Sequence, residues 1–293
     1  MASSSPVFRF APSPNGRLHL GHAYSALVNE RLATGSCGEL LLRIEDIDLG
    51  RCRPEFEQGI HEDLAWLGIG FAPEVRRQSL HFDDYRQALD RLDAMGLIYP
   101  CFCSRQEIKD TVRRCEAETG TPWPRDPDGA PLYPGTCRAP GGAELRRRAA
   151  SEPHVLRLAM ERALARAAGE SLSYRLFDEA GEERDIPVDP ARWGDVVLAR
   201  KDVPTSYHLS VVVDDALQGV SHVVRGKDLE AATDIHVLLQ RLLGLAVPRY
   251  HFHRLLNDET GQKLAKSRLS RSLADLRADG ATPEAIRRQL GFT

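Results

Sequence analysis

Two histidines that flank a leucine and a glycine stand near the start of the chain, in the segment "RFAPSPNGRLHLGH" (9–22). They are His19 and His22, and apolar residues at helical spacing follow them, so they fall on the first turn of an expected helix. Imidazoles beside the N–H groups of a first helical turn can donate to phosphate oxygens as charge builds up in an in-line displacement. Gly21 lets a nucleotide lie against the backbone. The segment predicts chemistry at the α-phosphorus of a nucleotide.

A second group of candidate residues stands near the C-terminus. Lys263, Lys266 and Ser267 belong to "KLAKS" (263–267), which follows a polar loop. A lysine-bearing loop can close on a triphosphate and neutralise the leaving pyrophosphate. Five residues alone carry little information, but these follow the second half of an expected α/β sheet whose first half carries the two histidines. Their position therefore supports the same nucleotide chemistry.

Three cysteines have the spacing of metal ligands: Cys101, Cys103 and Cys137. Three thiolates suit a tetrahedral zinc site, which needs a fourth ligand. Tyr133 and Cys115 are the two candidates for that ligand. Residues 101–150 are rich in proline and glycine and show little periodicity, so zinc would hold a module with a small apolar core. The alternative is a set of reduced structural thiols.

The elements that must position these residues alternate between strands and helices. Short β-favouring runs predict strands at 7–10, 39–46, 195–200 and 221–226. Helical periodicity predicts helices at 19–34, 54–68, 81–96, 228–244 and 282–291, with a further element at 207–219. Thr282 is expected to cap the last helix and Pro283 to occupy its first position. Such alternation predicts an α/β fold with a parallel sheet.

Changes in the helical and strand patterns along the chain also predict its division into domains. We expect the first half of a catalytic domain at 1–100, an inserted zinc-bearing module at 101–190, the second half of the catalytic domain at 191–250, and the lysine-bearing loop with a helical tail at 251–293. The insertion is expected because helical and strand patterns fade after Gly96 and return near 195.

The composition is that of an ordinary globular protein. The 293 residues are 42% hydrophobic and 28% charged, with a net charge of -3. The N-terminus lacks the pattern of a signal peptide, and no run approaches the ~20 apolar residues of a membrane span, so we expect a cytoplasmic protein. We also expect it to be a monomer. The net charge excludes a globally basic nucleic-acid coat, but the basic residues at 263–271 and 287–288 are candidate tRNA contacts.

Taken together, the motifs resemble those of a known enzyme family. They are "RFAPSPNGRLHLGHA" (9–23), "RIEDID" (43–48), "YHLSVVVDDALQGVSHVVRGKDL" (207–229) and "KLAKS" (263–267). They resemble the glutamyl and glutaminyl branch of the class I aminoacyl-tRNA synthetases, whose HIGH and KMSKS signatures stand at these places. The resemblance implies a Rossmann-like domain, ATP with Mg²⁺, and an aminoacyl-adenylate. The implied ATP-binding residues are His19, Gly21, His22, Lys263, Lys266 and Ser267, and the catalytic ones among them are His19, His22 and Lys266.

The charge of glutamate predicts what its pocket should contain. Two carboxylates and one ammonium need more than one cation, an anion and neutral donors, and arginine can bind a carboxylate through two parallel hydrogen bonds. In glutamyl-type enzymes the matching positions here are Arg9, Ser13, Glu45, Tyr207 and Arg225. Glu45 would hold the ammonium and Arg225 the side-chain carboxylate. Arg9 and Ser13 would contact neighbouring oxygens, whereas each residue alone is as well explained as an ion pair or a core-edge residue.

One branch of this family, the glutamyl-Q branch, has a similar Cys-x-Cys, Tyr-x-x-x-Cys site, which implies zinc bound by Cys101, Cys103, Tyr133 and Cys137. Only 26 residues follow Ser267, too few for an anticodon-binding domain. The same branch consists of the catalytic core and, without tRNA, activates L-glutamate for transfer to the queuosine base in the anticodon loop of tRNA(Asp). We therefore expect L-glutamate, ATP and queuosine-containing tRNA(Asp) as substrates.

Two departures and three rival interpretations stay open. "KLAKS" lacks the middle Met-Ser of the family signature, and Lys227 stands beside Arg225 where an acidic residue is common. The rivals are a small nucleotidyltransferase that makes a non-tRNA adenylate, a non-catalytic paralogue that binds glutamate or tRNA, and a truncated synthetase that charges tRNA(Glu) with a partner. The glutamate-like residue set disfavours the first, and intact His19, His22 and Lys266 disfavour the second.

Overall fold

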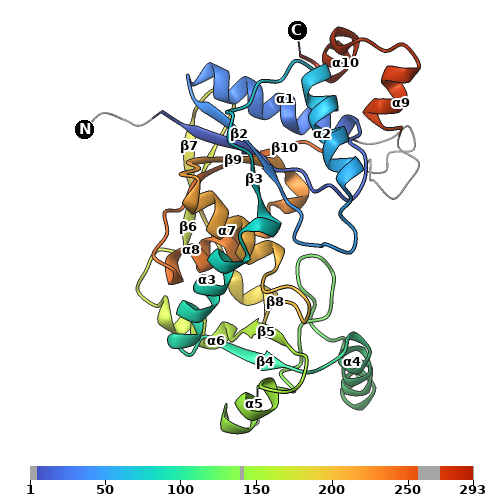
Figure 1. Cartoon of the computed structure of the whole chain (residues 1–293). Helices are drawn as coiled ribbons and strands as arrows, with labels where there is room; N and C mark the ends of the chain where they lie inside the picture. The colour runs from blue at the N-terminus through green and yellow to red at the C-terminus, as the bar shows by residue number, and fades with distance from the viewer. Residues whose placement is uncertain (1–4, 139–141, 257–270, 293) are drawn as a thin grey trace.

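The computed structural model describes residues 5–138, 142–256 and 271–292. The lysine-bearing segment 263–267 lies outside the described residues. Figure 1 shows a large sheet in the upper part of the molecule and a small sheet with α4 and α5 at its lower end. Among the described residues no helix is long and apolar enough to cross a membrane.

The large sheet has seven strands in the order β3-β2-β1-β9-β10-β6-β7. The strands are β1 (Val7–Phe10), β2 (Glu39–Ile44), β3 (Arg76–Arg77), β6 (Ser173–Phe177), β7 (Glu183–Pro187), β9 (His222–Gly226) and β10 (Arg249–His253). Every neighbouring pair is parallel except β6 and β7. This confirms the predicted α/β fold with a parallel sheet.

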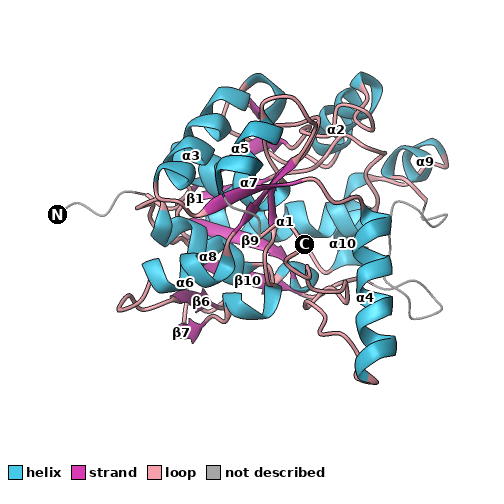
Figure 2. Ribbon diagram, turned by 90° about the horizontal axis from the view of Figure 1, so that it is seen from below, coloured by secondary structure: helices cyan, strands magenta, loops and turns pink. Residues whose placement is uncertain are grey.

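Helices lie on both sides of the large sheet (Figure 2). They are α1 (Leu20–Gly35), α2 (Pro54–Trp66), α3 (Phe82–Ala94), α7 (Tyr207–Leu217), α8 (Thr233–Leu242), α9 (Leu273–Ala278) and α10 (Pro283–Leu290), with short 3-10 helices η1 (Gln78–Leu80), η2 (Pro190–Trp193) and η3 (Lys227–Leu229). Strand β2 shows why both faces are apolar: Leu40 and Leu42 pack in the cluster that contains α1, while Leu41 packs with Val237 of α8. Alternate side chains of a strand point to opposite faces, so a sheet covered on both sides needs the continuous apolar run found here.

The small sheet is antiparallel, in the order β4-β5-β8. Its strands are β4 (Ile98–Cys101), β5 (Val155–Leu158) and β8 (Val197–Ala199), and the helices between them are α4 (Arg105–Thr119), α5 (Gly142–Ala149) and α6 (Met160–Arg166). The domain boundaries stay a prediction. Strands β6 and β7, which the sequence division assigned to the insertion, pair with the large sheet.

Helix α4 was not expected in a segment with little periodicity. Val112 is the one buried residue of α4, so the sequence of this helix has no apolar stripe that would predict it. The available signal is the capping box, in which Ser104 accepts from Glu107 N and the Glu107 carboxylate accepts from Ser104 N. The last helix begins as predicted: Thr282 Oγ1 accepts from Ala285 N at 3.2 Å, and Pro283 is its first residue.

Candidate active site

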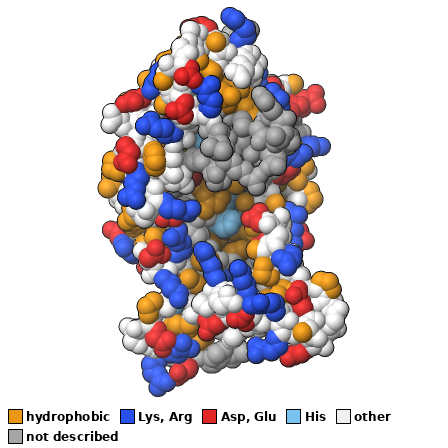
Figure 3. All heavy atoms as spheres, turned by 90° about the vertical axis from the view of Figure 1, so that its right-hand side faces the viewer, with side chains coloured by type: hydrophobic (Ala, Val, Ile, Leu, Met, Phe, Trp, Pro, Cys, Tyr) orange, Lys and Arg blue, Asp and Glu red, His pale blue; other side chains and the backbone are white. Residues whose placement is uncertain are grey.

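A cavity of about 530 Å³ opens at the carboxyl ends of β1, β9 and β10, where ligands bind in open α/β sheets. All the described residues that were predicted to bind glutamate or ATP line it: Arg9, Ser13, His19, Gly21, His22, Glu45, Tyr207 and Arg225. Lys263, Lys266 and Ser267 lie outside the described residues. Figure 3 shows a hollow with apolar walls and a histidine side chain on the face seen from the right of Figure 1. Sequence reasoning missed further lining residues, among them Asn15, Asp228, His253 and Arg254.

The two histidines cap α1 with their own rings. Nδ1 of His19 accepts from Gly21 N and Nδ1 of His22 accepts from His19 N, each at 3.1 Å. From these bonds we assign the proton of each neutral ring to Nε2, the tautomer that can donate to a phosphate oxygen. A Cβ on residue 21 would lie 2.9 Å from Cε1 of His19. Gly21 therefore leaves room for the His19 ring, a role that the sequence did not reveal.

A buried ionic cluster includes Arg9, which lines the cavity. The fully buried Arg43 pairs with Asp215, and Nε of Arg9 contacts Oδ1 of the same carboxylate at 3.0 Å. Burial alone would raise the pKa of Asp215, but Arg43 and Arg9 outweigh it and hold that pKa below its usual range. Asp215 thus stays ionised and fixes the Arg9 guanidinium. Arg43 and Asp215 stand inside motifs quoted from the sequence, yet nothing in the pattern singled them out.

Glu45 follows β2 directly, and its backbone N–H donates to Pro12 O at 3.0 Å. Its Oε1 lies 3.9 Å from Nε of Arg43. Burial raises the pKa of Glu45 to about 7 even though Arg43 and Arg9 act to lower it. A carboxyl group in this state ionises readily when a cation approaches, which suits it to hold an ammonium group.

Arg225 of β9 is 4% exposed and is held from α8. Its Nη2 donates to Thr233 Oγ1 at 2.7 Å, and its Nη1 lies 3.1 Å from Nδ1 of His236. Its Nε is buried and has no hydrogen-bond partner in the described part of the chain. Its Cζ lies 5.3 Å from the centre of the Tyr250 ring. Arg225 therefore brings a buried positive charge to the wall of the cavity.

Three further residues that the sequence singled out lie in or near the walls of the cavity. Burial raises the pKa of Tyr207, so its phenol stays neutral. Ser13 Oγ lies 3.9 Å from Sγ of Cys52. Lys227 does not line this cavity but a separate one of about 480 Å³, together with Glu230 and residues of the β6–β7 hairpin. The departure at Lys227 therefore places a positive charge in the wall of the second cavity.

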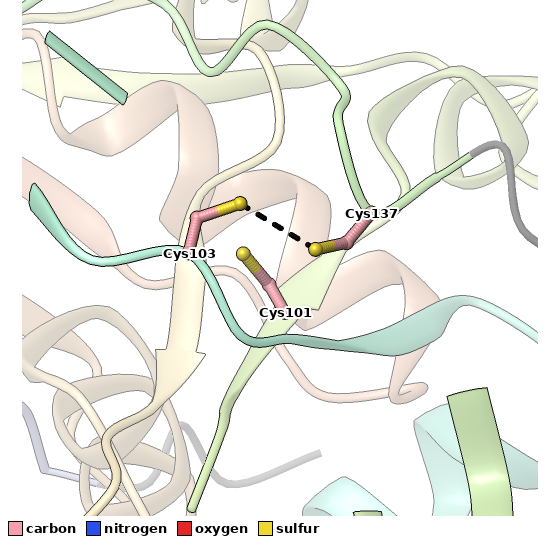
Figure 4. Close-up of side chains that lie close together, drawn as sticks. All are labelled: Cys101, Cys103 and Cys137. Carbon is pink, nitrogen blue, oxygen red and sulfur yellow. Dashed lines mark hydrogen bonds between the residues drawn. The ribbon is translucent and has the colours of Figure 1, made fainter. Parts of the chain in front are cut away.

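The three predicted cysteine ligands come together at the end of β4 (Figure 4), with their Sγ atoms within 4.8 Å of one another. The Tyr133 hydroxyl lies 3.3 Å from Sγ of Cys101 and 3.4 Å from Sγ of Cys103, and it accepts from Cys137 N at 2.8 Å. Cys115, on α4, does not belong to this group of described residues. Three thiols and a phenol oxygen match zinc in number and mostly in type.

Comparisons with known proteins agree with this geometry. The catalytic-domain family of class I tRNA synthetases (E and Q) matches residues 7–293. A glutamyl-Q tRNA(Asp) synthetase of Rhodobacter capsulatus is 47% identical over 288 residues, which cover 98% of this chain and 100% of that protein. Glutamate–tRNA ligase 2 of Nitrosococcus oceani is 38% identical over 292 residues, which cover 95% of this chain and 57% of that protein.

Among solved structures, a glutamate-tRNA synthetase from Elizabethkingia anophelis superposes with a TM-score of 0.77 at 25% identity, over 98% of this chain and 61% of that one. The resemblance noted in the sequence motifs is thereby confirmed. Since the family match and the identity both extend over nearly the whole chain, the protein belongs to the class I aminoacyl-tRNA synthetases of the glutamyl and glutaminyl type, which are ligases.

Proposed function

We propose that this protein activates L-glutamate with ATP in the absence of tRNA and transfers the glutamate to the queuosine base of tRNA(Asp). One observation carries the proposal: the same cavity is lined by His19 and His22, which could donate to a nucleotide phosphate, and by charged residues that complement glutamate. Arg9 and Arg225 supply two cations and Glu45 supplies one anion, which complements two carboxylates and an ammonium. Arg225 lines this cavity and its terminal nitrogens contact the neutral groups of Thr233 and His236, which supports its assignment to the side-chain carboxylate.

The first step would join glutamate to AMP. An oxygen of the substrate α-carboxylate attacks the α-phosphorus of ATP, an acyl–phosphate bond forms, and the bond to the leaving pyrophosphate breaks. Nε2–H groups of His19 and His22 would donate to the phosphate oxygens as charge develops. Lys263 and Lys266 are proposed to neutralise the pyrophosphate with Ser267 beside it, and Mg²⁺ would enter with ATP.

The proposed acceptor rests on the relatives rather than on a residue that reads queuosine. The Rhodobacter capsulatus protein that aligns over its whole length carries the glutamyl-Q name. Of the predicted tRNA contacts, Arg287 donates to Leu67 O at 3.0 Å and pairs with Glu30, and Arg271 pairs with Asp279. Arg288 is exposed, so of these three it is the one best placed to meet a phosphate.

We further propose that Cys101, Cys103, Tyr133 and Cys137 hold a structural Zn²⁺. The ion would supply no chemistry to the reaction, and it would cross-link the end of β4 to the segment around Tyr133. The cluster of thiols and a phenol in a poorly periodic segment supports this proposal.

The experiment that tests the function is exchange of labelled pyrophosphate into ATP with glutamate and no tRNA, with aspartate and glutamine as controls. Labelled glutamate is then offered to tRNA(Asp) with and without queuosine and to tRNA(Glu). Of the three amino acids, only glutamate is expected to support exchange. Of the tRNAs, only tRNA(Asp) that contains queuosine is expected to become labelled. Labelling of tRNA(Glu) would replace the proposed acceptor, and a lack of both reactions would overturn the proposal.

The rate of exchange at low glutamate is expected to rise with pH and to level off above about 7. Burial raises the pKa of Glu45 to about 7, so the free enzyme holds an uncharged acid below that pH and a carboxylate above it. Because kcat/KM reports the ionisation of the free enzyme, it should rise ~10-fold per pH unit below this pKa. Glu45→Gln should remove the step and leave a low, flat profile. A wild-type profile without a step between pH 6 and 8 would contradict this assignment.

A further inference from the structure

Arg225 differs from Arg9 and Arg43 in what holds it. Arg9 and Arg43 share the carboxylate of Asp215. Among the described residues, by contrast, no ion pair joins Arg225 to a carboxylate, and its two terminal nitrogens contact His236 and Thr233 instead. Both of these partners belong to α8, the helix that packs behind β9 and β10.

The hydrogen bonds fix the protonation of two buried rings. A guanidinium only donates, so Nδ1 of His236 must be the acceptor and the proton of a neutral ring must be on Nε2. That Nε2 lies 3.3 Å from Nδ1 of His208 on α7, which must therefore accept in turn. Burial and then the charge of Arg225 lower the pKa of His208 to about 4 and that of His236 well below its usual range. A chain of donors thus runs from Arg225 through His236 to His208 with both rings neutral.

Neutral partners orient a guanidinium without cancelling its charge. Two of the five N–H donors of Arg225 are used by Thr233 and His236, and neither of these partners carries a negative charge. A carboxylate partner would hold the group equally well but would oppose the approach of a second carboxylate. The full positive charge of Arg225 therefore stays available to distinguish a carboxylate from a neutral amide of the same shape.

We propose that His236, supported by His208 and together with Thr233, is a positioning residue that aims Arg225 at the substrate side chain and so selects glutamate over glutamine. This inference rests on the proposed activation of glutamate. His236 does not line the cavity, so it acts through Arg225 and not by contact with the substrate.

The test is the exchange assay on His236→Leu, with glutamate, glutamine and ATP each varied. We expect KM for glutamate to rise ~10- to 100-fold, the glutamate-over-glutamine ratio of kcat/KM to fall at least ~10-fold, and KM for ATP to stay within ~2-fold. His236→Asn places an amide oxygen near the position of Nδ1 and should restore most of the selectivity. Gln240→Leu is the matched control, because Gln240 is equally buried on α8 but hydrogen-bonds to the Tyr250 hydroxyl. It should keep the selectivity of the wild type.

The outcomes separate a failure of this inference from a failure of the proposed function. An active His236→Leu enzyme with unchanged selectivity overturns the inference alone, and so does a Gln240→Leu enzyme that loses selectivity equally. A wild type without glutamate-dependent exchange overturns the proposed function and this inference with it. If His236→Leu does not fold, Thr233→Val removes the other acceptor of Arg225. It should show the same fall in selectivity, and unchanged selectivity in that variant overturns the inference.

Discussion

Substitution of Arg225 by methionine is expected to lower kcat/KM for glutamate ~100- to 3,000-fold and to leave KM for ATP nearly unchanged. Arg225 is 4% exposed, and among the described residues its guanidinium contacts only neutral hydrogen-bond partners. Removing one member of a buried charge pair typically costs ~3–5 kcal/mol, because the other charge is left unpaired, and ~1.4 kcal/mol corresponds to a factor of ten. The substrate carboxylate would be that unpaired charge. Methionine keeps an apolar stem of similar length beside Tyr250, so the loss should be electrostatic rather than structural.

Arg249→Met is the matched control for this substitution. Arg249 stands on the neighbouring strand β10, is about 41% exposed, and pairs with Glu183 away from the cavity. Exposed ion pairs contribute little, so this variant should activate glutamate within ~2-fold of the wild type. The measurement is pyrophosphate exchange over a range of glutamate concentrations. An unchanged glutamate dependence in Arg225→Met would remove Arg225 from the substrate pocket.

Loss of the metal is expected to have the largest effect on the fold. The purified protein should contain about one zinc per chain by elemental analysis, and Cys137→Ser should contain almost none. Structural zinc contributes ~10–16 kcal/mol of apparent binding energy in small zinc domains, and the apolar cluster at this site is small. The segment that contains α4 and Tyr133 should then open to proteases at temperatures at which the wild type resists them.

Cys115→Ser is the control that separates the proposed ligands from the other thiols, since Cys115 lies outside the cluster. It should retain its zinc and its resistance to proteolysis. Tyr133→Phe removes only the phenol oxygen and should weaken zinc binding without abolishing it, because three thiolates remain. Full zinc occupancy in Cys137→Ser would rule out the proposed ligand set.

The sequence predicted best those features that depend on neighbouring residues. The strand at 7–10 and the cap at Thr282 follow from local patterns, and the structure places both as expected. The predicted cavity residues come from motifs at the carboxyl ends of strands, and a parallel sheet brings such ends together. Their grouping in one cavity could therefore be anticipated, although their roles in binding are still to be tested.

Features that depend on distant residues were not accessible in this way. Arg43 and Asp215 are 172 positions apart, and His208 and His236 are 28 apart on different helices. No local period connects such pairs, so only the packing of α7 and α8 against the sheet reveals them. Helix α4 was not predicted for a different reason. So little of it is buried that its sequence lacks the apolar stripe of an amphipathic helix.

The proposed glutamate-binding residues stand on, or directly after, three adjacent strands, so the large sheet sets the distances between their backbones. Glu45 directly follows β2, Arg9 lies on β1 and Arg225 on β9, and these three strands are consecutive in the sheet. Parallel strands are ~4.8 Å apart, so the backbones that carry the anion and the far cation are held ~10 Å apart by the hydrogen-bond ladder. A version of this enzyme for a shorter or longer amino acid would therefore have to be made by changing the lengths of side chains, with the backbone left as it is.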